Sequence, residues 1–125
     1  LESTMSSGQH ESVEKELRRA IPKTWNRQLI SLYAKLDAPD LTTLSKRVER
    51  WLVDRPRDSN LWLAASQLAK RDELWAQAKQ FLERSLENKE TLLAYNELGL
   101  ILLELGQENE AIKAFNKALD LKKNQ

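Results

Sequence analysis

The chain has no cysteine, which excludes disulfide bonds, thiolate metal ligands and a cysteine nucleophile. Its one histidine, His10, lies in a polar stretch with no second histidine beside it, so we expect this side chain to be free and solvated. A Ser-His-Asp triad would need a histidine that the rest of the chain does not have. We therefore predict no catalytic residue, no metal, no cofactor and no enzyme activity.

The chain also lacks an excess of charge of one sign and a long apolar run. Lysine and arginine number 20 against 19 acidic residues, a balance that argues against a dedicated nucleic-acid binder. The most apolar stretch, residues 98–105, is interrupted by Gly99 and Glu104 and is far shorter than the ~18 residues that a membrane span needs. We expect no nucleic-acid partner and no membrane span in this chain, whose 125 residues suit one domain with a modest core.

Glycine and proline are rare, with three of each, and most of them fall where helices are expected to end. Pro22, Pro39 and Pro56 each bias the preceding residue away from helical geometry, and Gly106 is a natural helix stop. Between these points apolar residues recur every three or four positions, which is typical of helices. No Asn-Gly or Asp-Gly pair indicates a β-hairpin, so the sequence predicts an all-helical chain.

The same periodicity predicts six or more helices joined by short links. Asp40, and either Asp58 or Ser59, are placed to cap the helices that follow them. Links of a few residues force neighbouring helices to pack antiparallel, as successive hairpins. The predicted helices cover about residues 13–20, 25–36, 41–55, 59–70, 74–86, 91–105 and 108–121.

Residues 1–11 show no apolar periodicity and mix serine, threonine, glycine and glutamine. We expect them to be a disordered leader or a remnant of expression. Because Met5 follows Leu1 so closely, either the natural protein starts near Met5 or the chain is a fragment of a longer one.

The last two helices carry a pattern of small and aromatic residues at Tyr95, Leu98, Gly99, Leu102, Ala111, Phe115 and Ala118. This spacing matches the tetratricopeptide repeat, in which small residues let the two helices of a hairpin approach closely. A more degenerate copy precedes it, with Ala78 standing one repeat before Ala111 and Ser66 replacing the glycine. We predict an all-α fold, a right-handed stack of antiparallel tetratricopeptide-like hairpins (an α-solenoid). It forms one domain over residues 12–125, with units of about 24–56, 59–90 and 91–125.

Three local features occur together in this chain: the pair Trp51 and Leu52, the pair Leu74 and Trp75, and a helix end at Leu86. With their surroundings, over most of the chain, they resemble the C-terminal repeat domain of HemY-type proteins. Those are bacterial inner-membrane proteins associated with haem (porphyrin) biosynthesis, so the resemblance implies a scaffold role in that process. Family members carry N-terminal transmembrane helices and this chain has none. We therefore expect an excised soluble domain of a membrane-tethered parent, or a truncated relative.

A stack of this kind presents the first helix of each hairpin on its concave face, where we expect a partner-binding groove. The repeat register places these side chains there: Leu63, Gln67, Lys70, Arg71, Leu93, Asn96, Leu100 and Leu103. In the first unit Arg27, Ile30 and Ala34 are weaker candidates. Leu93, Leu100 and Leu103 exceed what the hairpin core needs, so they form either a partner surface or a contact with the chain's own C-terminal helix or a second copy.

Three functions therefore stay open. The first is a non-catalytic scaffold that binds a partner peptide or helix in the groove, and the second is a module that self-associates through its C-terminal hairpin. The third is a tetrapyrrole-binding protein with a non-ligated porphyrin on Leu100 and Tyr33, against which the lack of a core histidine argues. The first half also carries many basic residues, which suit a solvated face or, alternatively, an acidic partner or anionic lipids. They are Arg18, Arg19, Lys23, Arg27, Lys46, Arg47 and Arg50.

Overall fold

The computed structural model describes residues 7–124, and these form seven α-helices and no strand. The helices are α1 (Ser7–Thr24), α2 (Arg27–Ala34), α3 (Leu41–Asp54), α4 (Ser59–Arg71), α5 (Trp75–Asn88), α6 (Leu92–Glu104) and α7 (Glu108–Lys123). The prediction of an all-helical chain, made from the apolar spacing, is confirmed for the described residues.

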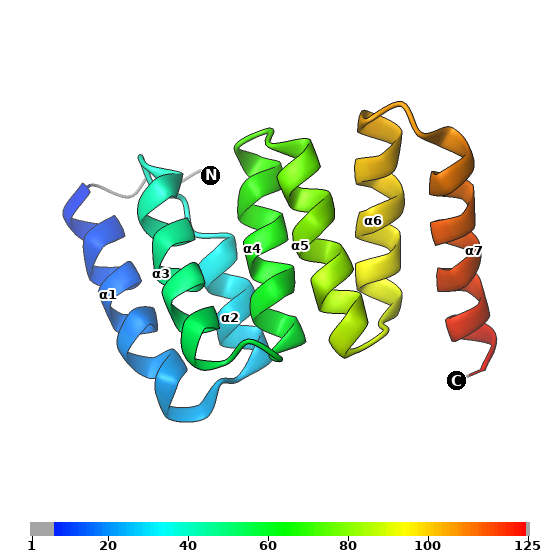
Figure 1. Ribbon diagram of the computed structural model, residues 1–125. Helices are drawn as coiled ribbons and strands as arrows, with labels where there is room; N and C mark the ends of the chain where they lie inside the picture. The colour runs from blue at the N-terminus through cyan, green and yellow to red at the C-terminus, as the bar shows by residue number, and fades with distance from the viewer. Residues whose placement is uncertain (1–6, 125) are drawn as a thin grey trace.

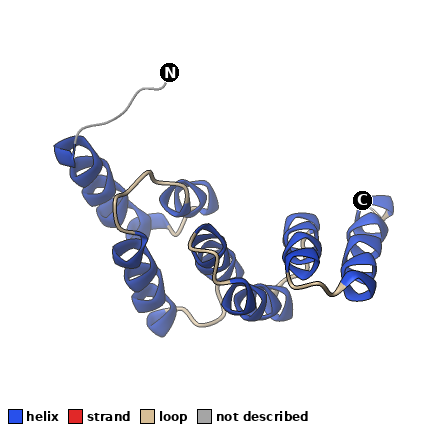
Figure 2. Ribbon diagram, turned by 90° about the horizontal axis from the view of Figure 1, so that it is seen from above, coloured by secondary structure: helices blue, strands red, loops and turns tan. Residues whose placement is uncertain are grey.

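The helices stand side by side in one row from α1 to α7 (Figure 1). Seen from above, the row is curved, with α2, α4 and α6 on the inside of the curve and α3 and α5 on the outside (Figure 2). Helices α4 and α5 pack as one hairpin and α6 and α7 as another, while α4 also contacts α2 and α3. We term the side of α2, α4 and α6 the inner face, and the side of α3, α5 and α7 the outer face.

The core consists of three apolar clusters arranged along the row. The largest joins α1 to α4 and includes Tyr33, Leu44 and Trp51. The second joins α4 to α6 around Leu82 and Ile101, and the third, the smallest, joins α6 to α7. Each hairpin therefore depends on its neighbour for burial of its apolar side, which is the usual source of stability in repeat proteins.

Helix α1 begins earlier than the sequence predicts. Its first turn covers residues 7–11, which are therefore helical and not part of a disordered leader, while residues 1–6 lie outside the described residues. Two contacts hold the middle of α1: Leu17 packs on the largest cluster, and Glu14 accepts a hydrogen bond from Tyr33. Because adding residues to an existing helix costs little, a helix fixed at these points extends toward its N-terminus.

Helix α1 also continues past Pro22, where the sequence predicts its end. Ile21, whose backbone the proline biases away from a helix, is fully buried in the largest cluster, so tertiary packing outweighs the local preference. The chain then turns at Trp25, which has a positive φ of 52°. Its ring lies edge-on to that of Trp51, with centroids 5.9 Å apart, and the Arg55 guanidinium lies 4.5 Å from its centroid. These contacts hold a backbone conformation that is costly for a tryptophan.

Side-chain caps begin four of the helices. Asp40, predicted as a cap, and Asp58, one of two predicted candidates, accept backbone N–H groups of the following turn at 2.9 and 3.0 Å. Ser59, the other candidate, is the first residue of α4. Asn26 and Thr91 do the same for α2 and α6 at 2.7 and 3.1 Å. The cap at Asn26 was missed because the spacing of apolar residues placed the start of this helix at Trp25.

The turns between α4 and α5 and between α6 and α7 are copies of each other, one repeat apart along the chain. Each contains one residue with a positive φ, Glu73 at 57° and Gly106 at 75°. In each turn this residue and the next donate N–H groups to carbonyls in the last turn of the preceding helix, with N···O distances of 2.8–3.0 Å. Gly106 is thus the helix stop that the sequence predicts, and Glu73 adopts the same conformation without the freedom of glycine.

Gly99 allows α6 and α7 to pack closely. It is buried, and a Cβ at this position would overlap the ring of Phe115 on α7. Ala111 and Ala118 of α7 are also buried. These small residues have the role that the repeat pattern predicts for them.

The matched turns predict opposite effects when their residues are changed. Glu73→Gly should stabilise the chain by about 1 kcal/mol, because a left-handed conformation costs an L residue ~1–2 kcal/mol and glycine avoids most of that cost. Gly106→Glu should destabilise it by a similar amount. Urea denaturation followed by circular dichroism measures both, and a shift of both variants in the same direction would contradict the equivalence of the turns.

Candidate functional site

Three leucines on one side of α6 are exposed. Leu93, Leu100 and Leu103 have exposed fractions of 51%, 46% and 47%. Their spacing of seven and three residues places them on one side of the helix, with the exposed Asn96 between them. Other apolar residues of α6, such as Ile101, are buried in the core. We term Leu93, Leu100 and Leu103 the apolar stripe; the fold leaves it without a covering element among the described residues.

The predicted groove residues of α4 are partly used by the fold. Leu63 is half-buried and packs on the second cluster, and Gln67 is half-buried as well. The Lys70 Nζ lies 3.3 Å from the Glu97 Oε1, an ion pair that joins α4 to α6. Because both side chains are partly exposed, this pair adds little to the free energy of unfolding. The pair does place one positive and one negative charge at the junction of α4 and α6, beside the apolar stripe.

Arg71 is exposed and at the same time joins α4 to the end of α2. Its Nη1 donates to the Ala34 carbonyl at 2.7 Å, and its Nη2 donates to the Leu36 carbonyl at 2.8 Å. The side chain therefore satisfies carbonyls at and just beyond the C-terminal end of α2, which the helix itself leaves without partners. The sequence placed Arg71 in the groove because its register fits, but a contact with a helix so distant in the chain cannot be read from a local pattern.

The first unit contributes less to the inner face than expected. Ile30 and Ala34 are buried and belong to the core, so their assignment to the groove is wrong, while Arg27 is exposed. The reason is that α2 is short and packs against both α1 and α4. Leu32, on the same helix, is 53% exposed.

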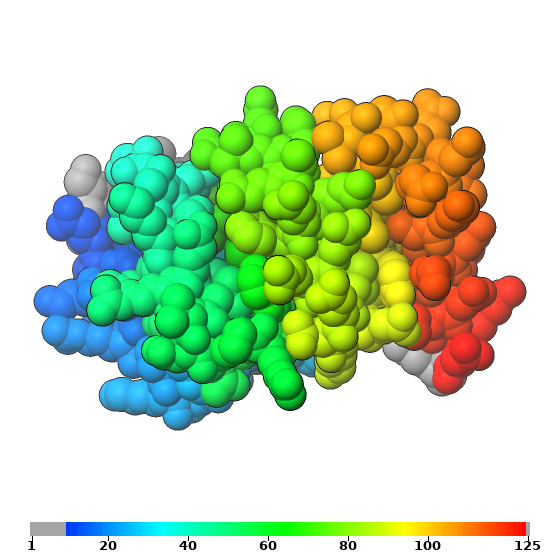
Figure 3. Space-filling view, in the orientation of Figure 1, coloured from blue at the N-terminus to red at the C-terminus, as the bar shows by residue number. Residues whose placement is uncertain are grey.

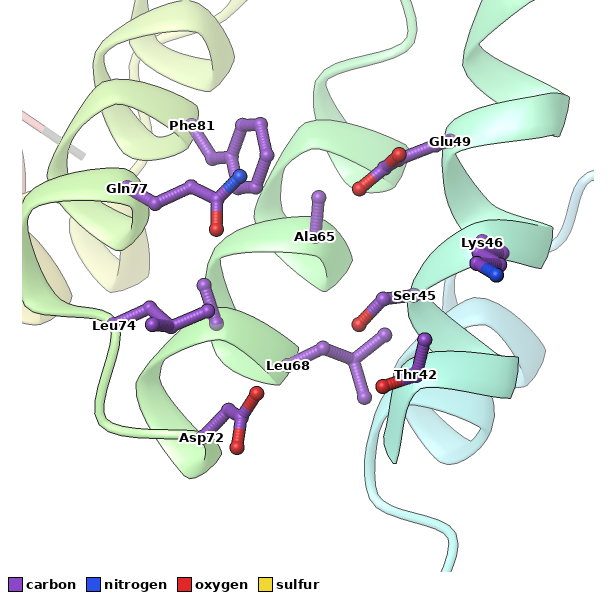
Figure 4. A pocket seen from close by; sticks show the side chains of 11 residues that line it. Thr42, Ser45, Lys46, Glu49, Ala65, Leu68, Asp72, Leu74, Gln77 and Phe81 are labelled. Carbon is purple, nitrogen blue, oxygen red and sulfur yellow. The ribbon is translucent and has the colours of Figure 1, made fainter. Parts of the chain in front are cut away.

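Two hollows on the outer face are repeats of each other. The first lies between α3 and α5 over α4, has a volume of about 220 Å³ and is lined in part by Phe81 (Figure 4). The second lies between α5 and α7 and has a volume of about 650 Å³. In Figure 3 the residues of α6, coloured yellow, are visible at the bottom of this hollow. Ala114 lines the second hollow at the position that Phe81 holds one repeat earlier, so a smaller side chain leaves more room. Neither hollow is predictable from the sequence, because the size of each depends on the distance between successive hairpins.

The larger hollow and the apolar stripe lie on opposite sides of α6. Tyr95, Leu98 and Leu102 line the hollow. At about 100° per residue, these positions point away from the side that carries the stripe. A partner on the inner face would therefore contact the stripe without reaching the hollow.

Tyr33 is buried beneath α1 and α3. It is fully buried, its ring centroid is 5.1 Å from that of Trp51, and its hydroxyl donates to the Glu14 Oε2 at 2.6 Å. Burial, and then this hydrogen bond, raise the pKa of Tyr33 well above its ordinary value. The expectation that a porphyrin could lie on Tyr33 is therefore wrong, since no face of the ring is accessible.

His10 also differs from the expectation that it is solvated. It is half-buried on α1, and both ring nitrogens are shielded from solvent without a hydrogen-bond partner among the described residues.

Two further features, a metal site and a helix able to span a membrane, are absent from residues 7–124. No group of three or more histidine, aspartate or glutamate side chains in this range is placed to hold a metal ion. None of the seven described helices has both the length and the apolar character that crossing a membrane requires.

Comparison with known proteins places the fold. Residues 92–125, the last hairpin, match the model of the tetratricopeptide repeat family. Eight chains of solved structures match, among them MamA (41 to the end) from Desulfovibrio magneticus RS-1. That chain is 12% identical and has a TM-score of 0.73, with 94% of this chain and 69% of the other covered. The protein therefore has the tetratricopeptide-like, all-α fold that the sequence predicts.

No curated protein matches the chain. The resemblance to HemY-type proteins therefore rests only on the sequence features that suggested it. Its implied link to haem biosynthesis stays a hypothesis.

The Arg71 contacts predict a loss of stability on substitution. Arg71→Met should lower the free energy of unfolding by ~1–2 kcal/mol, because two carbonyls at the end of α2 lose a charged donor. Arg71→Lys should recover less than half of this loss, since one ammonium cannot serve both carbonyls as a guanidinium does. Urea denaturation measures the effect, with Arg57→Met, in the exposed link before α4, as a control that should change stability by less than ~0.5 kcal/mol. Equal stability of the Arg71 and Arg57 variants would contradict the role given to Arg71.

The two tyrosines predict how the fold responds to alkaline pH. Burial and a hydrogen bond to Glu90 raise the pKa of Tyr95 to about 12, and the pKa of Tyr33 is also raised. The fold therefore favours the neutral phenols, and this contribution to stability is complete below about pH 10 and is lost as pH rises further. Tyrosinate absorbance of the folded protein should appear only well above pH 10. Because Tyr95 titrates before Tyr33, Tyr95→Phe should remove the first rise in this absorbance. A full tyrosine titration at about pH 10 in the folded chain would refute this reading.

Proposed function

We propose that this chain is a non-catalytic protein–protein interaction scaffold, which binds a peptide or a helix of its partner on the inner face of α4 and α6. The observation that supports the proposal is the apolar stripe of Leu93, Leu100 and Leu103, about half exposed beside a complete core. Stacks of helical hairpins commonly bind extended partners on their concave side.

The chemistry of the inner face suits a peptide or a helix. Covering three half-exposed leucines would contribute about 1 kcal/mol each by removing apolar surface from water. The amides of Gln67 and Asn96 lie on the same predicted face and offer donors and acceptors that fix the register of a bound chain. The Lys70–Glu97 pair adds one charge of each sign at the junction of α4 and α6. Arg71 is left out of the test below, because it also binds the end of α2 and its substitution would affect the fold.

A second candidate is self-association through the C-terminal hairpin. Ile112 and Leu119 of α7 are each 56% exposed. Leu119 stands one repeat after Leu86, which packs on the second cluster where α6 covers α5. By the repeat, a helix of a second copy would cover Leu119 in the same way. A partner from porphyrin biosynthesis is a narrower hypothesis that only the sequence resemblance supports.

Matched charge substitutions on the two surfaces test the proposal. Peptides are first selected for binding to the wild-type chain from a random displayed library. Leu100→Glu should weaken the selected peptides at least ~tenfold, about 1.4 kcal/mol, because a carboxylate cannot be buried in an apolar contact. Ile112→Glu, a change of the same type on α7, should leave their affinity unchanged, and both variants should melt near the wild-type temperature.

The outcomes separate the candidates. If Leu100→Glu unfolds the chain, the stripe is core and the binding surface is wrong. If the wild type shows a concentration-dependent mass in sedimentation that Leu119→Glu removes and Leu100→Glu does not, self-association through α7 is the better reading. If the selected peptides bind the Leu100→Glu and Ile112→Glu variants equally well, the inner face of α6 is not the peptide-binding surface.

A further inference from the structure

A row of basic residues on α3 faces a cleft at the opposite end of the molecule from α6. They are Lys46, Arg47 and Arg50, and the uncharged Thr43 precedes them by one turn on the same side of the helix. Together with two residues of α1 they line a cleft of about 430 Å³. The cleft exists because α1 packs on α2 and not closely on α3. We term it the α1/α3 cleft.

Positive charge in this cleft exceeds negative charge. Its one carboxylate, Glu14, already accepts hydrogen bonds from the Arg18 Nε at 3.0 Å and from the Tyr33 hydroxyl at 2.6 Å. Arg18 is thereby paired, but among the described residues Lys46, Arg47 and Arg50 form no ion pair. Three cations of the cleft therefore have no carboxylate at ion-pair distance among the described residues.

The arrangement is unfavourable for the isolated helix. Lys46 and Arg50 are four residues apart and Arg47 and Arg50 three apart, spacings at which like charges repel each other. The net charge of the whole chain is only +1, so acidic residues elsewhere in the chain balance most of this positive charge. An anion held between the helices would be attracted by all three cations, and added salt would weaken this attraction.

We propose that the α1/α3 cleft binds an acidic segment of a partner protein through its aspartate and glutamate carboxylates. Guanidinium groups match carboxylates with two parallel hydrogen bonds, and Arg47 and Arg50 can each offer one such pair. From Lys46 to Arg50 the basic residues span about 6 Å at ~1.5 Å per residue. An extended peptide covers that length with about two residues at ~3.3 Å each.

Other anions fit this cleft less well. Nucleic acid needs a longer basic surface, and the lining has no aromatic side chain on which a base could stack. A membrane surface is flat, whereas these cations line a recess between two helices, and the lining has no large apolar side chain to insert into lipid. The site is also separate from the apolar stripe, so the two can be tested independently.

Fluorescence anisotropy with a labelled hexaglutamate peptide and the full chain tests the proposal, with labelled hexaglutamine as the neutral control. Hexaglutamate should bind, hexaglutamine should not, and the affinity should fall as salt is added. Lys46→Gln combined with Arg50→Gln should weaken hexaglutamate at least ~tenfold. Lys113→Gln combined with Lys117→Gln, which removes the same charge from α7, should change the affinity less than about twofold.

A single charge reversal distinguishes binding from folding. Arg50→Glu places a carboxylate near Lys46 and Arg47, so it should abolish hexaglutamate binding while leaving the melting temperature unchanged or higher. Equal weakening by the α3 and α7 pairs would show that only net charge matters and would overturn the site. Preferential binding of an oligonucleotide, or of phosphatidylserine vesicles, that the same α3 pair removes would assign the cleft to phosphate and overturn the acidic peptide.

Discussion

Helix α4 is packed on three sides, and the arrangement of the other helices depends on the small side chains that make this possible. Ala64, Ala65, Ser66 and Ala69 are buried along its 13 residues, so α2, α3 and α5 can all lie against it. Arg71 at its end then binds the carbonyls at the end of α2. A bulky residue at any of the four small positions would separate helices that belong to two different core clusters. The curvature of the row, and with it the inner face, follows from this close packing.

The helices and their limits were predictable where the signal is local. Asp40, Asp58 and Gly106 act as the sequence indicates, because a cap or a helix stop involves only the residues of one turn. The groove was predictable only in part, since the exposure of a side chain depends on how the hairpins stack. The contact of Arg71 with the end of α2 was not predictable, because it joins residues far apart in the chain. The hydrogen bond from Tyr33 to Glu14 joins two separate helices in the same way, and no local periodicity indicates it.

The two candidate surfaces differ in the physical basis of their binding. The stripe on α6 offers apolar area, whose contribution is not screened by salt and falls on cooling. The α1/α3 cleft offers unpaired positive charge, whose contribution is greatest at low ionic strength and speeds the approach of an acidic partner. A scaffold with both could hold one partner at each end of the row, because the surfaces lie on different helices and share no residue.

The decreasing size of the core clusters along the chain implies that the molecule does not open uniformly. The first cluster draws on four helices, whereas the third joins only α6 and α7. Local unfolding begins where few apolar contacts are made, so amide hydrogens of the C-terminal hairpin should exchange fastest and those around Tyr33 slowest. The stripe lies on the hairpin that the smallest cluster holds together. A partner that binds it would also order this hairpin, so occupancy at the inner face would slow exchange in α7, a helix that the partner does not touch.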